Sequence, residues 1–128
     1  MGRIDRDPRS VAGRRAKLHQ FHEAVNVIRT VVDDDDELID VVVTLCVHAG
    51  IAASDVICLR SLGHYWRSGN HAEAVTHLRR VDPESARLLH ELLNLKSRAA
   101  YGHDAVTKAQ LTKATRAMDR LVEAASLA

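Results

Sequence analysis

Apolar residues recur along this chain at intervals of three and four positions, the spacing that places side chains on one face of an α-helix. We expect a first helix over residues 15–32 and a longer second helix over residues 36–62. A short helix should follow Asn70, a fourth should extend from Pro83 to a stop at Gly102, and a last one should follow Thr107. The first and last helices carry the most regular stripes, Leu18, Phe21, Val25, Ile28 and Val32, and Leu111, Ala114, Met118, Leu121 and Ala125.

Capping residues support these helix ends. A capping box joins two residues three positions apart, each bonding the backbone N–H of the other. Pro suits the first helical position because its missing N–H has no helical partner there. We expect Gly102 to take the left-handed conformation that closes many helices. The expected signals are the N-cap Asp82 before Pro83, the capping boxes Asn70–Glu73 and Thr107–Gln110, and the C-terminal glycines Gly63 and Gly102.

Composition agrees with an all-α protein. Aromatic residues make up only 3% of the 128 residues, so Leu, Val, Ile and Ala must build the core, and Leu and Ala favour helix. We therefore expect one domain over residues 15–128, a four- to five-helix up-and-down bundle, after a flexible charged arm over residues 1–14. The second helix should pack antiparallel against the first, and Gly50 should let another helix approach it closely.

The formal net charge of +1 excludes a uniformly basic nucleic-acid binder but permits a local basic patch. Arginines of the N-terminal arm are compatible with phosphate contacts or with a solvated tail. The four acids at 33–36 suggest either a metal site or a solvated turn at a helix N-terminus. The eight histidines lack zinc-ligand spacing, so we expect no metal and no cofactor.

Cys46 and Cys58 lie about 18 Å apart along one predicted helix, too far for a disulfide, so we expect buried reduced thiols. No signal-peptide core and no membrane span stand out in the sequence, which predicts a cytoplasmic protein without a membrane partner. Asp55 lies beside the apolar stripe of the second helix and should need a cation. We expect that cation to be Lys96 or Arg98.

Arg98 and His103 flank the predicted stop of the fourth helix, with four residues between them. A histidine can transfer a proton near neutral pH, and an arginine can hold a phosphate and stabilise its developing charge. The two groups suffice for RNA cleavage without a metal, in which the 2′-hydroxyl attacks the adjacent phosphate. The alternative interpretation is a helix-end cation and a loop histidine that do no chemistry.

The order of several short motifs resembles small stand-alone HEPN-like proteins of actinobacteria (HEPN, higher eukaryotes and prokaryotes nucleotide-binding). The resemblance covers roughly residues 18–125. The family signature is an arginine, four to six residues and a histidine before the last helix, and Arg98 to His103 matches it. The other motifs are Gly50-Ile-Ala-Ala-Ser-Asp55, Leu62-Gly63, His71-Ala-Glu-Ala-Val75 and Leu95-Lys-Ser-Arg-Ala-Ala-Tyr-Gly102.

This resemblance implies a helical bundle and a metal-independent endoribonuclease that serves as a toxin or defence component. It implies Arg98 and His103 as catalytic residues. Asp55, through its expected pairing with Lys96 or Arg98, is the residue that we expect to support them. It also implies a homodimer in which two corners face a shared cleft, and a nucleotidyltransferase-type antitoxin as a partner. The residues expected to bind RNA or a nucleotide are Lys96, Tyr101 and Arg67.

One position departs from the family pattern. Active members usually carry a polar residue directly after the arginine, and this chain has Ala99. The alternative is therefore a catalytically inactive HEPN-like module that binds a nucleotide, a nucleic acid or a protein. A third hypothesis is an unrelated helical bundle with a structural role.

Overall fold

The computed structural model describes residues 2–32, 37–67 and 71–127, and it is an all-α helical bundle with one small sheet. The helices are α1 (Pro8–Val31), α2 (Ile39–Leu62), α3 (His71–Val81), α4 (Pro83–Tyr101) and α5 (Lys108–Leu127). Two strands, β1 (Gly2–Asp5) and β2 (His64–Arg67), complete the described chain. The expected fold class is confirmed, whereas the sheet was not predicted.

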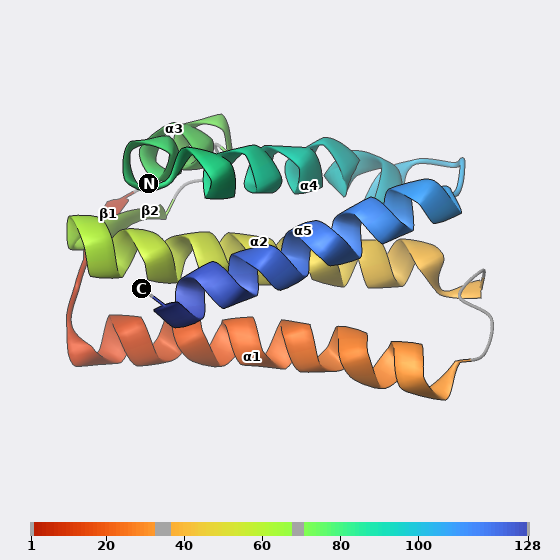
Figure 1. Cartoon of the computed structure of the whole chain (residues 1–128), viewed down its shortest axis with the longest axis horizontal. Helices are drawn as coiled ribbons and strands as arrows, with labels where there is room; N and C mark the ends of the chain where they lie inside the picture. The colour runs from red at the N-terminus through yellow and green to blue at the C-terminus, as the bar shows by residue number, and fades with distance from the viewer. Residues whose placement is uncertain (1, 33–36, 68–70, 128) are drawn as a thin grey trace.

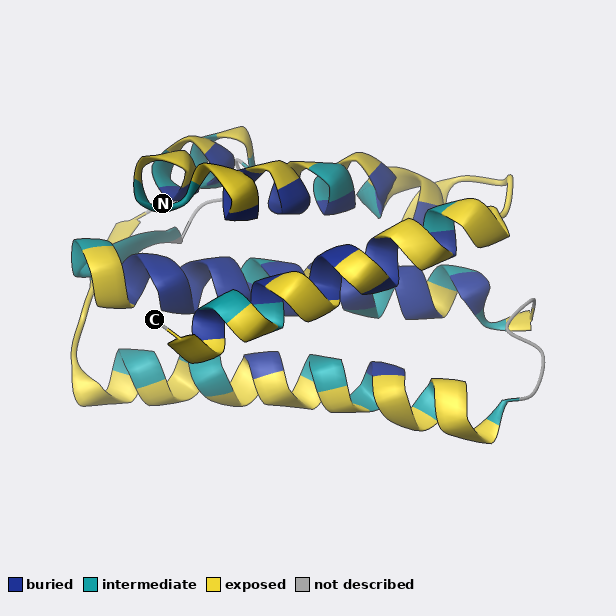
Figure 2. Ribbon diagram, viewed as in Figure 1, coloured by how far each residue is buried: buried dark blue, intermediate teal, exposed yellow. Residues whose placement is uncertain are grey.

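Helix α2 is the centre of the bundle. α1 lies antiparallel beside it, α4 lies on its other side, and α5 crosses in front of it (Figure 1). Figure 2 shows the result: α2 is mostly buried, while the outer side of α1 is exposed. Cys46 and Cys58 are buried free thiols, as expected. By length and composition α2 could also cross a membrane, but 67% of that apolar stretch is buried inside the bundle, as in any core helix.

Gly50 fixes how closely three helices meet. A Cβ placed there would lie 2.5 Å from Leu92 Cδ1 of α4 and 3.4 Å from Leu121 Cδ1 of α5. The residue is buried and α2 continues through it without a break. The prediction of a close helix approach at Gly50 is therefore confirmed, and the missing side chain is what permits it.

The N-terminus is more ordered than the flexible arm expected over residues 1–14. β1 pairs antiparallel with β2, with Gly2 opposite Arg67 and Ile4 opposite Tyr65. α1 begins at Pro8, where Asp7 and Ser10 form a capping box. The helix thus starts seven residues before the expected position. The many charged residues of this segment favoured a solvated arm, although Asp7, Pro8 and Ser10 are an ordinary helix-start signal.

The other helix ends agree with expectation in part. Gly63 closes α2 in the left-handed conformation at φ 83°, and Asp82 caps α4. Thr107 and Gln110 exchange the two hydrogen bonds of a capping box, at 2.9 and 3.1 Å. The expectation for Gly102 is wrong, since its φ of −71° and ψ of 154° are extended. The acids at 33–36 and the Asn70 cap lie outside the described residues.

Candidate functional site

The predicted site lies where α4 ends and the chain turns into α5. We call residues 97–104 the corner. The N–H of Gly102 donates to the Ser97 carbonyl at 3.0 Å and closes α4. Farther on, the N–H of Val106 donates to Asp40 Oδ1 at 2.8 Å, which ties this connection to the first turn of α2. The chain is thus anchored within the corner and just after it, and no sequence pattern predicted the anchor at Asp40.

A side chain at Gly102 would be crowded, although the backbone conformation of this residue is an ordinary one. A Cβ on Gly102 would lie 3.0 Å from the Arg98 carbonyl oxygen and 3.2 Å from Arg98 Cα. Both neighbours are backbone atoms of α4, so the last helical turn would have to move to accept a side chain. The glycine therefore holds the chain close beneath Arg98.

Arg98, Tyr101 and His103 line the same open pocket at the corner, together with Ser97, Gly102 and Asp104. The pocket has a volume of about 460 Å³. The His103 side chain is 97% exposed, with Nε2 3.8 Å from Asp104 Oδ2. Within the described residues, Arg98 makes no hydrogen bond or ion pair. The structure thus brings together three of the six residues that we predicted for the site.

The corner is chemically suited to hold an anion in water. An unpaired guanidinium can bind phosphate oxygens with two parallel hydrogen bonds. The exposed Tyr101 ring offers a face on which a base can stack. The His103 imidazole can exchange a proton with a hydroxyl placed between it and the bound phosphate. No further described side chain orients that imidazole, so the ligand itself would have to complete the geometry.

Lys96 does not face the corner. Its ammonium donates to Nε2 of His71 at 2.8 Å, which requires a neutral His71 with its proton on Nδ1. Burial lowers the pKa of His71, and the positive charges of Lys96 and then His48 lower it further. Lys96 therefore contacts α3 rather than the corner pocket, contrary to its expected role in substrate binding. The side chain of Arg67, another predicted contact, is outside the described part of the chain.

Asp55 is paired with Arg14 and with neither of the residues that we expected, Lys96 or Arg98. Arg14 Nη2 lies 2.8 Å from Asp55 Oδ2, which joins α1 to α2. Burial raises the pKa of Asp55 to about 7, against the opposing charge and hydrogen bond of Arg14. Asp55 follows Asp40 by fifteen positions of one helix, or about 22 Å. It therefore supports the far end of the bundle and has no contact with the corner.

Within the described ranges, no three His, Cys, Asp or Glu side chains converge as metal ligands would. Comparison of the chain with protein-family models, with curated proteins and with solved structures finds no match. The resemblance to HEPN domains therefore stays a prediction.

Proposed function

We propose that the corner binds a phosphate of RNA and cleaves the RNA strand there without a metal. The observation that carries the proposal is the shared pocket. Arg98, in the last turn of α4, and His103, just after the end of that helix, line one open surface. Both side chains are exposed, so a polymer can reach them. This is also the arrangement that the HEPN resemblance implies.

In the proposed reaction, His103 takes the proton of a 2′-hydroxyl. The freed oxygen attacks the adjacent phosphorus and forms a 2′,3′-cyclic phosphate. The bond from phosphorus to the 5′ oxygen breaks, and that oxygen leaves with a proton from water. Arg98 binds the non-bridging oxygens and stabilises the charge that builds up on them. Tyr101 stacks on a neighbouring base and aligns the strand.

A dimer fits this proposal. A single corner offers one arginine and one histidine, both open to water, and Lys96 is occupied by His71. A symmetric pair of corners would double the number of phosphate ligands and exclude water from the reacting groups. The HEPN resemblance also leads us to propose a nucleotidyltransferase-type antitoxin as the partner that blocks the site.

A second candidate function is binding without cleavage. It is favoured by the exposure of His103, whose contact with a carboxylate, that of Asp104, is as long as 3.8 Å. Ala99 is buried at 8% exposure and adds no polar group beside Arg98. Arg98 and Tyr101 would still bind a nucleotide or an RNA end in the absence of an oriented base.

The deciding experiment incubates the purified protein with structured and unstructured RNAs in EDTA. We expect cleavage to leave cyclic phosphate ends and to stop when a single 2′-hydroxyl is removed at the cleavage position. His103→Ala should lower the rate by about 10²–10⁴-fold, and Arg98→Ala by about 10²–10³-fold. His19→Ala, an exposed histidine on α1, is the matched control and should keep full activity.

Cleavage that persists in His103→Ala would refute the assignment of the base. RNA binding that depends on Arg98 and Tyr101, without cleavage of any RNA, would establish the binding module in its place. No binding and no cleavage would reject both functions.

A further inference from the structure

A second charged surface lies next to the corner, in the groove between α4 and α5. We call it the α4–α5 groove. It has a volume of about 350 Å³, and its charged walls are Arg87 and Glu91 on α4 and Lys113, Arg116 and Arg120 on α5. The three α5 residues are spaced three and four positions apart, so they lie on one face of the helix. The floor between the walls is formed by small and apolar side chains.

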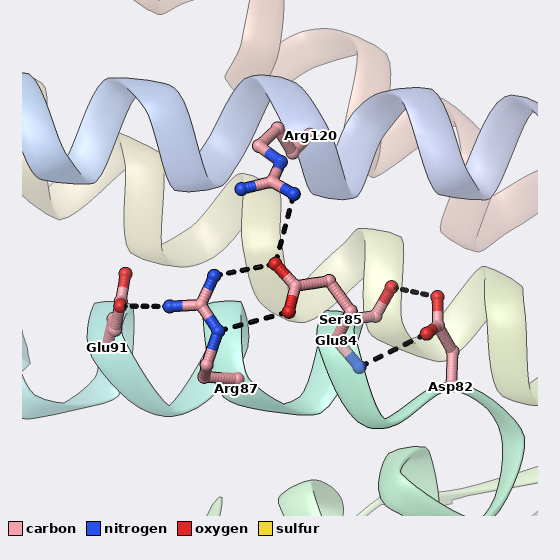
Figure 3. Close-up of polar contacts among 6 residues, drawn as sticks. All are labelled: Asp82, Glu84, Ser85, Arg87, Glu91 and Arg120. Atoms are coloured by element: carbon pink, nitrogen blue, oxygen red, sulfur yellow. Dashed lines mark hydrogen bonds and ion pairs between the residues drawn. The ribbon is translucent and has the colours of Figure 1, made fainter.

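The α4 wall is fixed by a network of ion pairs (Figure 3). Arg87 donates from Nε and Nη2 to the two carboxylate oxygens of Glu84, at 3.1 and 2.6 Å, and from Nη1 to Glu91 at 2.6 Å. Arg120 reaches across from α5 to within 3.0 Å of Glu84 Oε1. The hydrogen bonds from Arg87 are the main reason why the pKa of Glu84 is lowered. Glu91 in the groove and Glu84 in the adjoining network are therefore already neutralised by Arg87 and Arg120.

Lys113 and Arg116 differ from these arginines. Both are exposed, and neither has a hydrogen bond or an ion pair within the described residues. The groove and its network hold four cations and two acids, a net charge of +2, on a chain whose formal net charge is only +1. Its unpaired positive charge is concentrated on the α5 wall, where an incoming anion would meet it first.

The groove leads toward the corner. Arg87, Glu91 and Arg98 are separated by four and seven positions and share one face of α4. Arg98 lies about 16 Å beyond Arg87 along the helix axis. On the opposite wall, Lys113 and Arg116 follow the start of α5 by about 8 and 12 Å. A chain of negative charges that starts at Arg98 would therefore meet Lys113 and then Arg116.

We propose that the α4–α5 groove holds the backbone of a single-stranded RNA whose reacting phosphate lies at the corner. This inference rests on the proposed function and names the extent of its substrate. The 16 Å span corresponds to about five nucleotides of a stacked strand at the duplex rise of 3.4 Å per nucleotide, and an extended single strand covers it with fewer. RNA fits better than an acidic peptide because its charges repeat regularly and continue into the Arg98 pocket. Contacts to phosphate carry no sequence information, so the groove selects length rather than sequence.

The test measures binding in a His103→Ala background, so that cleavage does not consume the probe. The groove variant is Lys113→Gln/Arg116→Gln. The matched control, Arg79→Gln/Arg80→Gln, removes the same charge from exposed positions on α3. Labelled RNAs of two and ten nucleotides and a ten-nucleotide DNA are titrated at several salt concentrations, with poly-glutamate as a competitor.

We expect the groove variant to weaken binding of the ten-nucleotide RNA and DNA about tenfold and to lower the salt slope by about 1.4, at about 0.7 per phosphate contact on a single strand. Binding of the dinucleotide, and all binding by the control variant, should be unchanged. The inference is overturned if the groove variant binds normally, if both variants lose equal affinity, if poly-glutamate competes as well as RNA, or if no RNA binds. Failure of the cleavage proposal is distinguishable, because long strands would still bind through the groove without being cut.

Discussion

Removal of Arg14 should destabilise the protein much more at pH 8 than at pH 5. Arg14→Met keeps most of the aliphatic stem and deletes the guanidinium that contacts Asp55. The Asp55 side chain is 13% exposed, so it has little access to water as a substitute. Burial holds the pKa of Asp55 at about 7 while the charge and hydrogen bond of Arg14 act to lower it. Without Arg14, the pKa of Asp55 must rise further.

The size of the effect depends on the charge of Asp55. At pH 5 the carboxyl is protonated in both folded proteins, and the variant loses one hydrogen bond, about 1 kcal/mol. At pH 8 the wild-type carboxylate is ionised and paired, and its partner is missing in the variant. The variant carboxyl can take up a proton instead of staying charged, so linkage limits the extra cost at pH 8, one unit above the folded pKa of about 7, to about 1.4 kcal/mol and the total cost to about 2.4 kcal/mol.

The direction of this pH dependence follows from the linkage between proton binding and folding. The folded pKa of Asp55 lies above its ordinary value of 3.8, so folding takes up a proton between these pH values. The associated stability is full below about pH 4 and is lost as the pH rises through about 7. In Arg14→Met the folded pKa is higher, so the loss continues to a higher pH. The difference in free energy of unfolding between the wild type and Arg14→Met must therefore increase from pH 5 to pH 8.

Urea unfolding at a fixed protein concentration gives the free energies at both pH values. Asp55→Asn supplies the control, since Arg14→Met in that background should cost about 1 kcal/mol at either pH. An equal cost of Arg14→Met at pH 5 and pH 8, with Asp55 intact, would refute the reasoning. It would mean that the charge of Asp55 does not depend on Arg14.

Three further predictions concern packing, the corner and assembly. Gly50→Ala should destabilise by about 1–3 kcal/mol in urea unfolding because the new methyl overlaps Leu92, whereas Gly13→Ala, with open space around it, should stabilise by about 0.5–1 kcal/mol; equal effects would contradict the packing argument. Gly102→Ala should lower RNA binding or cleavage with a small change in Tm, because it displaces the Arg98 turn; unchanged RNA kinetics would contradict this. Sedimentation at micromolar concentration should show a dimer, and a single 14.2 kDa species would reject it.

Local features of the sequence predicted most of the helices and the composition of the corner. Stripes of apolar residues specify helices because burial rewards one face wherever the helix packs. Arg98 and His103 line the same pocket because they are close in sequence at a helix end, where a short turn limits their separation. The start of α1 was missed although Asp7, Pro8 and Ser10 form an ordinary capping signal.

Pairings between distant segments could not be predicted in the same way. Asp55 needed a buried cation, but its position in the sequence did not distinguish Arg14 on α1 from Lys96 on α4. The bond between Asp40 and Val106 depends on how α2 meets the turn before α5, which only the packed bundle determines. The crowding at Gly102 likewise depends on where the chain passes after the helix, so the residue was predicted for a conformation that it does not adopt.

The pairing of β1 with β2 ties the first residues of the chain to a segment in its middle, across the whole α1–α2 hairpin. Closing so long a loop costs entropy that four-residue strands cannot offset on their own. We therefore expect the two strands to pair after α1 and α2 have packed and brought Arg6 next to Gly63, where a backbone hydrogen bond of 2.8 Å joins them. We expect the sheet to form late in folding and to open when the packing of α1 against α2 loosens. Exchange of its backbone amide protons would therefore measure how stably this end of the bundle is packed.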